Sequence, residues 1–213
     1  MSDGGRIGVD ESGKGDYFGP LVIAACYVAD FHNAELEGVM DSKKLTDAKA
    51  LQLDAVIRAT CPFAVVAIGP EKYNDLYAKI RNLNRLLEWG HAQAIQNVLE
   101  KQPCREVISD QFANPAGLER TLKAKGLDVN LESRVRAEAD LAVAAASILA
   151  RAEFLRRLKR LGEGAGMDLP KGAGANVDQT AKRFVQAQGE GALKTVAKLH
   201  FRTTEKVLGR PLV

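Results

Sequence analysis

The sequence predicts an α/β protein, because short apolar runs typical of strands alternate with longer stretches of helical periodicity. The strand-like runs open at residue 7 and recur at residues 21–28, 62–68, 106–109 and 127–131. Helical patterns cover residues 46–59, 83–99, 118–125, 141–161, 177–188 and 193–199. The glycine-rich segment 162–176 lies between helical stretches and requires no domain boundary, so we expect a single domain over residues 1–213.

Length and composition are those of an ordinary globular protein with one sizeable core. The chain has 213 residues, of which 46% are hydrophobic and 27% charged, and a net charge of only +3. The net charge of the whole chain therefore does not indicate nucleic-acid binding. Evidence for such binding must come from the local distribution of basic residues. No apolar run approaches the length of a membrane helix, and the N-terminal residues lack a signal-peptide core.

The three cysteines, Cys26, Cys61 and Cys104, are odd in number and widely spaced. None belongs to a C-x-x-C pair, so neither a disulfide framework nor a zinc site is indicated. We expect reduced, buried thiols in a soluble cytoplasmic protein that does not bind membranes.

The segment with the most candidate functional residues is 7–22, which reads IGVDESGKGDYFGPLV. It opens as an apolar strand and places two adjacent carboxylates, Asp10 and Glu11, where that strand should end. Successive side chains of a regular strand point to opposite faces. The two carboxylates can therefore share a site only if the backbone turns between them or just after them.

The glycines that follow make such a turn easy, because Gly13 and Gly15, on either side of Lys14, carry no Cβ. A strand end with two carboxylates, a bare backbone and a lysine suits a divalent metal beside a phosphodiester. The purely structural alternative is a hairpin turn, in which acidic residues and glycines are common.

A phosphate-binding loop is a further alternative, since residues 8–14 match the pattern G-x-x-x-x-G-K. That motif requires Ser or Thr after the lysine to hold magnesium, and a full strand before its first glycine. Here Gly15 follows Lys14, and only seven residues precede Gly8. The context therefore disfavours a nucleotide-binding loop.

Further carboxylates occur at two other element boundaries. Asp110 ends the predicted strand at 106–109, and Glu138 and Asp140 precede the alanine-rich helix at 141–161. Helix capping alone could explain the latter two, because a helix N-terminus favours negative charge. The small side chains of that helix require very close packing against a neighbouring element.

Basic residues gather in three places, each of which has a solvated-surface alternative. Lys43 and Lys44 precede a helix whose predicted cap is Thr46, and a helix N-terminus favours anions. Lys171 lies in the glycine-rich segment, in a loop suited to phosphate. The end of the chain carries a third group, consisting of Lys194, Lys198, His200, Arg202 and Lys206.

The predicted helix at 83–99 has an apolar stripe that faces the core. Trp89 and His91 also lie on this helix. We interpret both as packing or surface residues rather than as ligands.

Taken together, these motifs resemble those of the type 2 ribonuclease H family, and within it those of the ribonuclease HIII branch. The similar segments follow one another along nearly the whole chain: DESGKGDYFGPLV, DSKKL, ISDQFA, AEADLAVAAASILAR, LPKGAG and KLHFRTTEKV. The resemblance implies a ribonuclease H-like α/β fold with a central mixed sheet flanked by helices and a helical C-terminal segment. It also implies an endoribonuclease that hydrolyses the RNA strand of RNA/DNA hybrids.

Catalysis in this family uses four acidic residues with Mg²⁺ or Mn²⁺. Carried over by motif, the four fall on Asp10, Glu11, Asp110 and Glu138. The spacing from Glu138 to Ser147 is one residue shorter than the family pattern, which leaves Asp140 as the alternative fourth ligand.

The chemistry of these residues agrees with the resemblance. Two divalent ions about 3.5 to 4 Å apart can activate water and stabilise the leaving oxygen of an in-line displacement. Carboxylates without a histidine cluster suit hard cations better than zinc. The implied products carry 3′-hydroxyl and 5′-phosphate ends.

Substrate contacts divide into two kinds. The resemblance assigns recognition of the 2′-hydroxyl to Gly13, Lys14 and Gly15, since that group distinguishes RNA from DNA. Contacts with phosphates, which give affinity without reading sequence, are predicted for Lys43, Lys44, Lys171 and Lys198.

Members of the ribonuclease HIII branch usually carry an additional N-terminal substrate-binding domain, whereas nine residues precede Asp10 here. We therefore expect weak hybrid binding that falls steeply with salt, and a monomer. Three alternatives remain open: a ribonuclease HII-like enzyme that incises at single ribonucleotides in DNA, a non-catalytic hybrid-binding module, and a metal nuclease that acts on DNA junctions.

Overall fold

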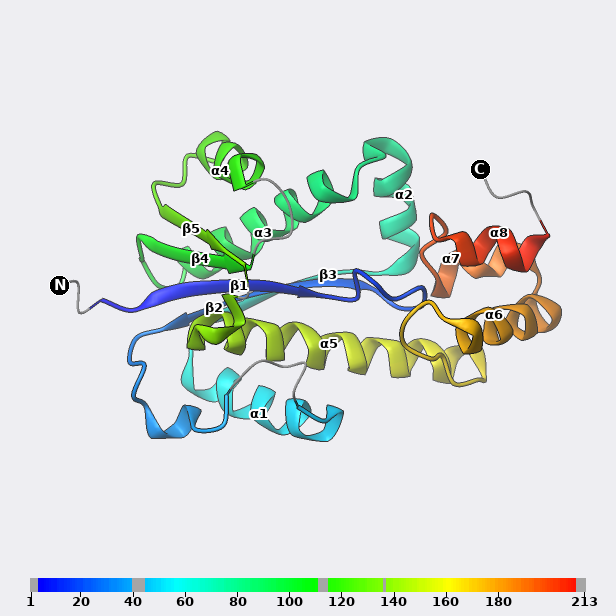
Figure 1. The fold of residues 1–213 in the computed structure, drawn as a ribbon, viewed down its shortest axis with the longest axis horizontal. Coiled ribbons are helices and arrows are strands. Elements are labelled where there is room, and N and C mark those ends of the chain that lie inside the picture. The colour runs from blue at the N-terminus through cyan, green and yellow to red at the C-terminus, as the bar shows by residue number, and fades with distance from the viewer. Residues whose placement is uncertain (1–3, 40–44, 111–114, 136, 210–213) are drawn as a thin grey trace. The chain divides into compact units, whose positions relative to one another are not determined.

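The computed structural model describes residues 4–39, 45–110, 115–135 and 137–209, and Figure 1 shows their fold. The chain divides into two compact units. The first consists of Met1–Ser12, Val22–Val66 and Asn82–Ala152, and the second of Gly13–Leu21, Ala67–Arg81 and Glu153–Val213.

A mixed five-stranded sheet with the order β3-β2-β1-β4-β5 confirms the predicted α/β class. The strands are β1 (Arg6–Ser12), β2 (Leu21–Val28), β3 (Phe63–Ile68), β4 (Glu106–Asp110) and β5 (Asn130–Arg134). β1 pairs with β2 in antiparallel orientation and with β4 in parallel orientation, and β4 and β5 are also parallel.

The last strand begins three residues later than the sequence pattern predicts. The amide of Leu127 bonds the carbonyl of Leu122 at 3.1 Å, so residues after α4 serve to end that helix. Pairing with β4 then starts where Asn130 lies opposite Glu106.

Eight α-helices belong to the described residues: α1 (Asp47–Thr60), α2 (Pro70–Ile80), α3 (Leu83–Leu99), α4 (Pro115–Ala124), α5 (Leu141–Ala165), α6 (Ala175–Gln188), α7 (Leu193–Val196) and α8 (Arg202–Leu208). Helices α2 and α8 were not among the helices predicted from the sequence. The cap of α1 is as predicted, since the hydroxyl of Thr46 accepts a hydrogen bond from the amide of Lys49.

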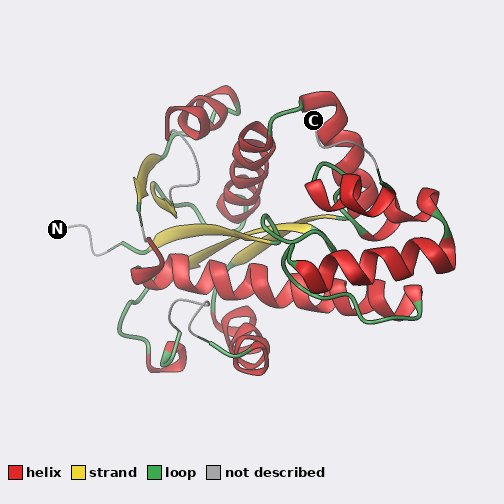
Figure 2. Ribbon diagram, turned by 45° about the vertical axis from the view of Figure 1, so that its right-hand side comes forward, coloured by secondary structure: helices red, strands yellow, loops and turns green. Residues whose placement is uncertain are grey.

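Helices cover both faces of the sheet, as Figure 2 shows. In the first unit, α3 and α4 lie on one face, and α1 and the first half of α5 lie on the other (Figure 1). The core is apolar, and Ile7, Val9, Ile23 and Leu87 are fully buried in it. Two helices therefore approach β1 from opposite faces, and this arrangement decides the surroundings of its two carboxylates.

The first half of α5 confirms the close packing expected from its alanines. A Cβ on Gly8 would overlap the backbone of Ala142 and Val143, so this helix lies directly against β1. Ala142 and Val143 are fully buried. Only a residue without a side chain allows this approach.

Among the described residues, no helix has the length and apolar character needed to cross a membrane.

Candidate active site

Asp10 and Glu11 lie near the end of β1, where they face Ala24 and Ile23 of β2. The strand continues through Ser12, so the two side chains point to opposite faces of the sheet. The turn follows at Gly13, whose φ of 87° favours glycine. The backbone therefore turns after the pair of carboxylates rather than between them.

Asp10 points to the face covered by α5. Its carboxylate accepts hydrogen bonds from the side chain of Ser147 on that helix and from the backbone amide of Glu11, the latter at 2.8 Å. These bonds hold the carboxylate of Asp10 at the strand end and favour its ionised form.

Burial and like charge act against that ionised form. The pKa of Asp10 is raised to about 7 by burial, by the charge of Glu11 and, to a smaller extent, by the charge of Asp110. Ser147 and the amide of Glu11 oppose the rise. The three predicted acids are therefore close enough to interact electrostatically.

Asp110 ends β4, and the sheet topology brings it to the same edge as Asp10. In the parallel pair, Val9 lies opposite Ser109, so the next residues of the two strands are Asp10 and Asp110. One carboxylate oxygen of Asp110 accepts a hydrogen bond from the amide of Ala137 at 3.1 Å. The segment that carries Glu138 is thereby attached to the end of β4.

The structure assigns different surroundings to the two candidates for the fourth acid. Asp140 pairs with Arg6 at 3.0 Å and accepts a hydrogen bond from the amide of Ala142 at 2.9 Å. Both contacts support the start of α5. The backbone of Glu138 belongs to a short 3₁₀ helix, η3 (Ala137–Ala139), whereas its side chain lies outside the described part of the structure.

Glu11 points to the face covered by α3, where His91 meets it. The Nε2 atom of His91 lies 3.0 Å from Oε2 of Glu11, and the imidazole is fully buried. From the sequence, His91 was interpreted as a packing or surface residue, and its contact with Glu11 was not predicted. The available signal was a polar side chain within the core-facing stripe of α3, because such groups need a partner.

The donor chemistry of the three acids suits a divalent cation. Carboxylate oxygens are ligands for hard ions, and a cation would offset the like charge that raises the pKa of Asp10. Within the described ranges, no three side chains of His, Cys, Asp or Glu already form a metal-binding group. The acids are gathered near one another, but they are not closed into a coordination sphere.

The predicted substrate loop belongs to the second unit. A Cβ on Gly13 would overlap the carbonyl of Pro20, so the loop closes tightly there, whereas Gly15 has open space around it. Asp16 accepts a hydrogen bond from the amide of Gly172 at 2.6 Å, and Tyr17 donates to the carbonyl of Gly172 at 2.8 Å. This loop and the segment carrying Lys171 therefore support each other.

Lys198, a predicted phosphate contact, is fully buried. Its Nζ donates to the carbonyl of Gly19 at 2.7 Å and lies 3.5 Å from the carbonyls of Phe18 and Pro20. Burial lowers the pKa of Lys198 to about 7, and the charge of Asp16 opposes that shift. This position suits support of the loop better than direct contact with phosphate.

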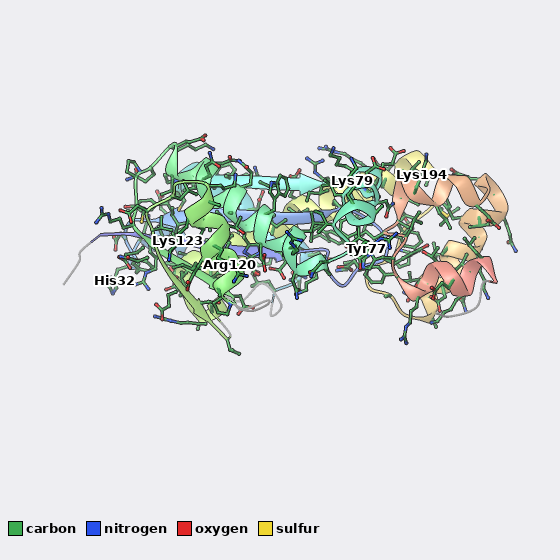
Figure 3. The ribbon with its side chains drawn as sticks, turned by 90° about the horizontal axis from the view of Figure 1, so that it is seen from above. His32, Tyr77, Lys79, Arg120, Lys123 and Lys194 are labelled. Carbon is green, nitrogen blue, oxygen red and sulfur yellow. The ribbon has the colours of Figure 1, made fainter. Side chains whose placement is uncertain are left out.

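The other basic residues at the end of the chain differ in their exposure and in their contacts. Lys194 is exposed, as is Lys79 on α2 (Figure 3), whereas Lys206 pairs with Asp178 at 3.1 Å. His200 stacks on Tyr77 with ring centroids 4.3 Å apart. The predicted basic cluster is thus only partly a solvated charged face. Lys43 and Lys44 lie outside the described residues.

Comparisons with known proteins agree with the sequence motifs. The model of the Ribonuclease HII family matches residues 7–204. Ribonuclease HIII of Protochlamydia amoebophila is 45% identical over 207 residues, which make up 96% of this chain and 69% of that protein.

Two solved structures share the fold. Bst-RNase HIII in complex with Mn²⁺ matches with a TM-score of 0.89 and 36% identity over 97% of this chain and 70% of its own. RNase HII of Archaeoglobus fulgidus, solved in a complex with PCNA, matches with a TM-score of 0.79 and 27% identity over 97% and 98% of the respective chains. With its motifs, topology and strand-end acids in agreement, the chain belongs to the ribonuclease HII family, in which Ribonuclease HIII proteins are among its relatives.

Proposed function

We propose that this protein is a metal-dependent ribonuclease H that hydrolyses the RNA strand of RNA/DNA hybrids. The observation that carries this function is the arrival of Asp10 and Asp110 at one edge of the sheet, with Glu11 close enough to affect the pKa of Asp10. Relatives named Ribonuclease HIII support it. The family match from residue 7 to 204 includes parts of both units, which supports one catalytic domain.

We assign the divalent cation, Mg²⁺ or Mn²⁺, to Asp10, Glu11 and Asp110, with Glu138 as the fourth ligand. The Mn²⁺ complex of Bst-RNase HIII supports this choice of metal. Bound by these residues, a pair of such ions would supply activation of water and charge neutralisation at the phosphate for an in-line displacement that leaves 3′-hydroxyl and 5′-phosphate ends.

The protein's own contribution is to hold these oxygens in place before the substrate arrives. Ser147 and the amide of Glu11 fix the Asp10 carboxylate, and the amide of Ala137 fixes that of Asp110. Ligands held in this way need little reorganisation during the reaction. Asp140 is already engaged with Arg6, which favours Glu138 as the fourth acid.

For the substrate, we retain recognition of the 2′-hydroxyl by the loop of Gly13, Lys14 and Gly15. The open space around Gly15 allows a sugar to approach the backbone. Phosphate contacts are proposed for Lys171, which is exposed, and for the pair Lys43 and Lys44.

A second candidate activity is incision at single ribonucleotides embedded in DNA. The match to the Ribonuclease HII family model favours including it. We further propose a cytoplasmic monomer, since the free thiols of Cys26, Cys61 and Cys104 suit a reducing compartment.

The test compares three labelled duplexes: a continuous RNA/DNA hybrid, a DNA duplex with one ribonucleotide, and an all-DNA duplex. Each is incubated with Mg²⁺, with Mn²⁺ and with excess EDTA. We expect metal-dependent cleavage of the RNA strand in the continuous hybrid and no cleavage in EDTA.

The other outcomes are informative in different ways. Cleavage of the all-DNA duplex would indicate a DNA nuclease, and binding of the hybrid without cleavage would indicate a non-catalytic module. Stronger cleavage at the single ribonucleotide would favour the ribonuclease HII-like activity. Binding measured at several salt concentrations tests the phosphate contacts, since their loss of affinity with salt should be steep.

A further inference from the structure

We propose that His91 is a positioning residue that orients the Glu11 carboxylate toward the divalent cation. The inference rests on the proposed role of Glu11 as a metal ligand. It adds a residue that no strand-end motif contains, since His91 lies 80 positions further along the chain.

The contact between the two side chains has the geometry of a direct hydrogen bond. Nε2 of His91 lies 3.0 Å from Oε2 of Glu11, and the Glu11 side chain retains only 11% exposure. An ionised carboxylate can only accept hydrogen bonds, so Nε2 must carry the hydrogen. One oxygen of Glu11 is thereby fixed on the protein side, which limits the rotation of the carboxylate.

The packing of α3 explains how the imidazole reaches this position. Ile23 is the strand partner of Glu11, and both side chains point to the α3 face of the sheet. A Cβ on Gly90 would lie 2.7 Å from Cδ1 of Ile23, so the helix comes unusually close to the sheet there. The next residue, His91, is thus placed against the side chain of Glu11.

The second ring nitrogen faces the other acid-bearing strand. Nδ1 of His91 lies 3.5 Å from Oγ of Ser109, which precedes Asp110 and donates to its carbonyl oxygen at 3.0 Å. Ser109 is buried, with 1% exposure. The imidazole therefore lies between the ends of β1 and β4, behind two of the proposed ligands.

A carboxylate that binds a metal is commonly held by a further hydrogen bond, and loss of that partner weakens metal binding by about 10-fold to 100-fold. A histidine that merely fills the core would affect folding stability without a specific effect on the metal. Metal affinity, measured apart from cleavage, separates the two roles.

The experiment compares His91→Asn with His91→Gln. The amide nitrogen of Gln lies the same number of bonds from the backbone as Nε2, so it can still donate to Glu11, whereas the shorter Asn cannot. Mn²⁺ affinity is measured by electron paramagnetic resonance on the free protein, and thermal unfolding is measured in EDTA. Asn97→Ala is the matched control, because Asn97 is on α3 and pairs with Gln93.

We expect His91→Asn to weaken Mn²⁺ binding at least about 10-fold, and His91→Gln to remain within about 3-fold of the parent. The kcat for the hybrid should fall with the Asn variant while KM stays unchanged. In a Glu11→Gln background, His91→Asn should have little further effect on Mn²⁺ affinity, because both act on the same ligand. Equal Mn²⁺ affinities of folded parent and Asn variant would overturn the proposal, as would additive effects in the double variant.

A measurement on the parent protein decides the matter if His91→Asn fails to fold. The Nε2–H resonance of His91 should shift as Mg²⁺ is added and saturate with the metal-binding curve. An unchanged resonance at saturating Mg²⁺ would refute the positioning role. Such a result in a protein that still cleaves hybrids would leave the proposed function intact, whereas a parent that neither binds metal nor cleaves would refute the function itself.

Discussion

The Asp10 carboxyl in the first unit is partly buried and the Lys198 amine in the second is fully buried, and both have a pKa of about 7. Burial is the largest cause in each case, raising the pKa of the acid and lowering that of the base. Their neighbours differ. Lys198 donates to backbone carbonyls, whereas Asp10 lies near Glu11 and Asp110, whose charges repel its own.

This difference separates a structural role from a functional one. Carbonyl dipoles satisfy the ammonium of Lys198, and the same contacts hold the turn from Phe18 to Pro20. The like charges around Asp10 would be offset by binding of a proton or of a cation. A displaced pKa therefore indicates a site only when the neighbouring groups oppose the charged form.

The largest expected effect comes from Asp10→Asn, which removes a proposed metal ligand together with the repulsion. We expect single-turnover cleavage of the hybrid to fall at least about 1000-fold while hybrid binding persists. In EDTA, the free energy of unfolding measured with urea should rise. Asp128→Asn is the control, because Asp128 is exposed and its carboxylate lies 3.0 Å from the guanidinium of Arg105, away from the proposed metal ligands. Parental cleavage by Asp10→Asn would refute the metal assignment.

Lys198→Met tests the structural role of the buried amine in the second unit. Loss of the ammonium leaves the carbonyls of Phe18 and Gly19 without this donor, and we expect the free energy of unfolding to fall by about 2 to 3 kcal/mol. Lys194→Met, at an exposed position on α7, should change it by less than about 0.5 kcal/mol. Equal effects of the two substitutions would show that the buried amine does not stabilise the loop.

A further effect is expected in the pH dependence of folding stability without metal, to which Asp10 and Lys198 should contribute with opposite sign. Between about pH 4 and 7 the folded state keeps a proton on Asp10 that the unfolded state has lost, so rising pH destabilises. Between about pH 7 and 10 the unfolded state keeps the proton on Lys198 that the folded state has lost, so rising pH stabilises.

Urea denaturation of the parent, Asp10→Asn and Lys198→Met over this pH range isolates the two contributions. Each difference from the parent should change by roughly 1 to 3 kcal/mol across its own window. A parent whose stability changes with pH in the same way as both variants would contradict the assigned pKa values.

The sequence was sufficient for features that depend on local patterns. It predicted the strand that carries Asp10, the Thr46 cap and the core-facing helix α3 (Leu83–Leu99), because periodicity and capping act within a few residues. It also predicted that Asp10 and Asp110 lie at the ends of strands, and the β1–β4 pairing brings these two strand ends to the same edge of the sheet.

Features that depend on distant partners were not predictable. Helix α2 is held by Asn74, whose side chain bonds the carbonyl of Ala197 and the amide of Leu199, each at 2.9 Å. Lys198 has its carbonyl partners about 180 positions earlier in the chain, and His91 has its partner 80 positions earlier. From the sequence alone, each of these polar side chains could equally lie on the surface. Only the folded structure shows which distant residue it contacts.

The contact of Gly8 with the start of α5 has a consequence for protein engineering. Since the strand backbone at Gly8 rests directly on Ala142 and Val143, no side chain can be introduced at this position, two residues before Asp10, without moving the helix. The position of α5 therefore fixes the distance between its first turns and the strand that carries Asp10. Substitutions that probe the surroundings of Asp10 are therefore better made at Ser147, whose side chain reaches that carboxylate, than at Gly8.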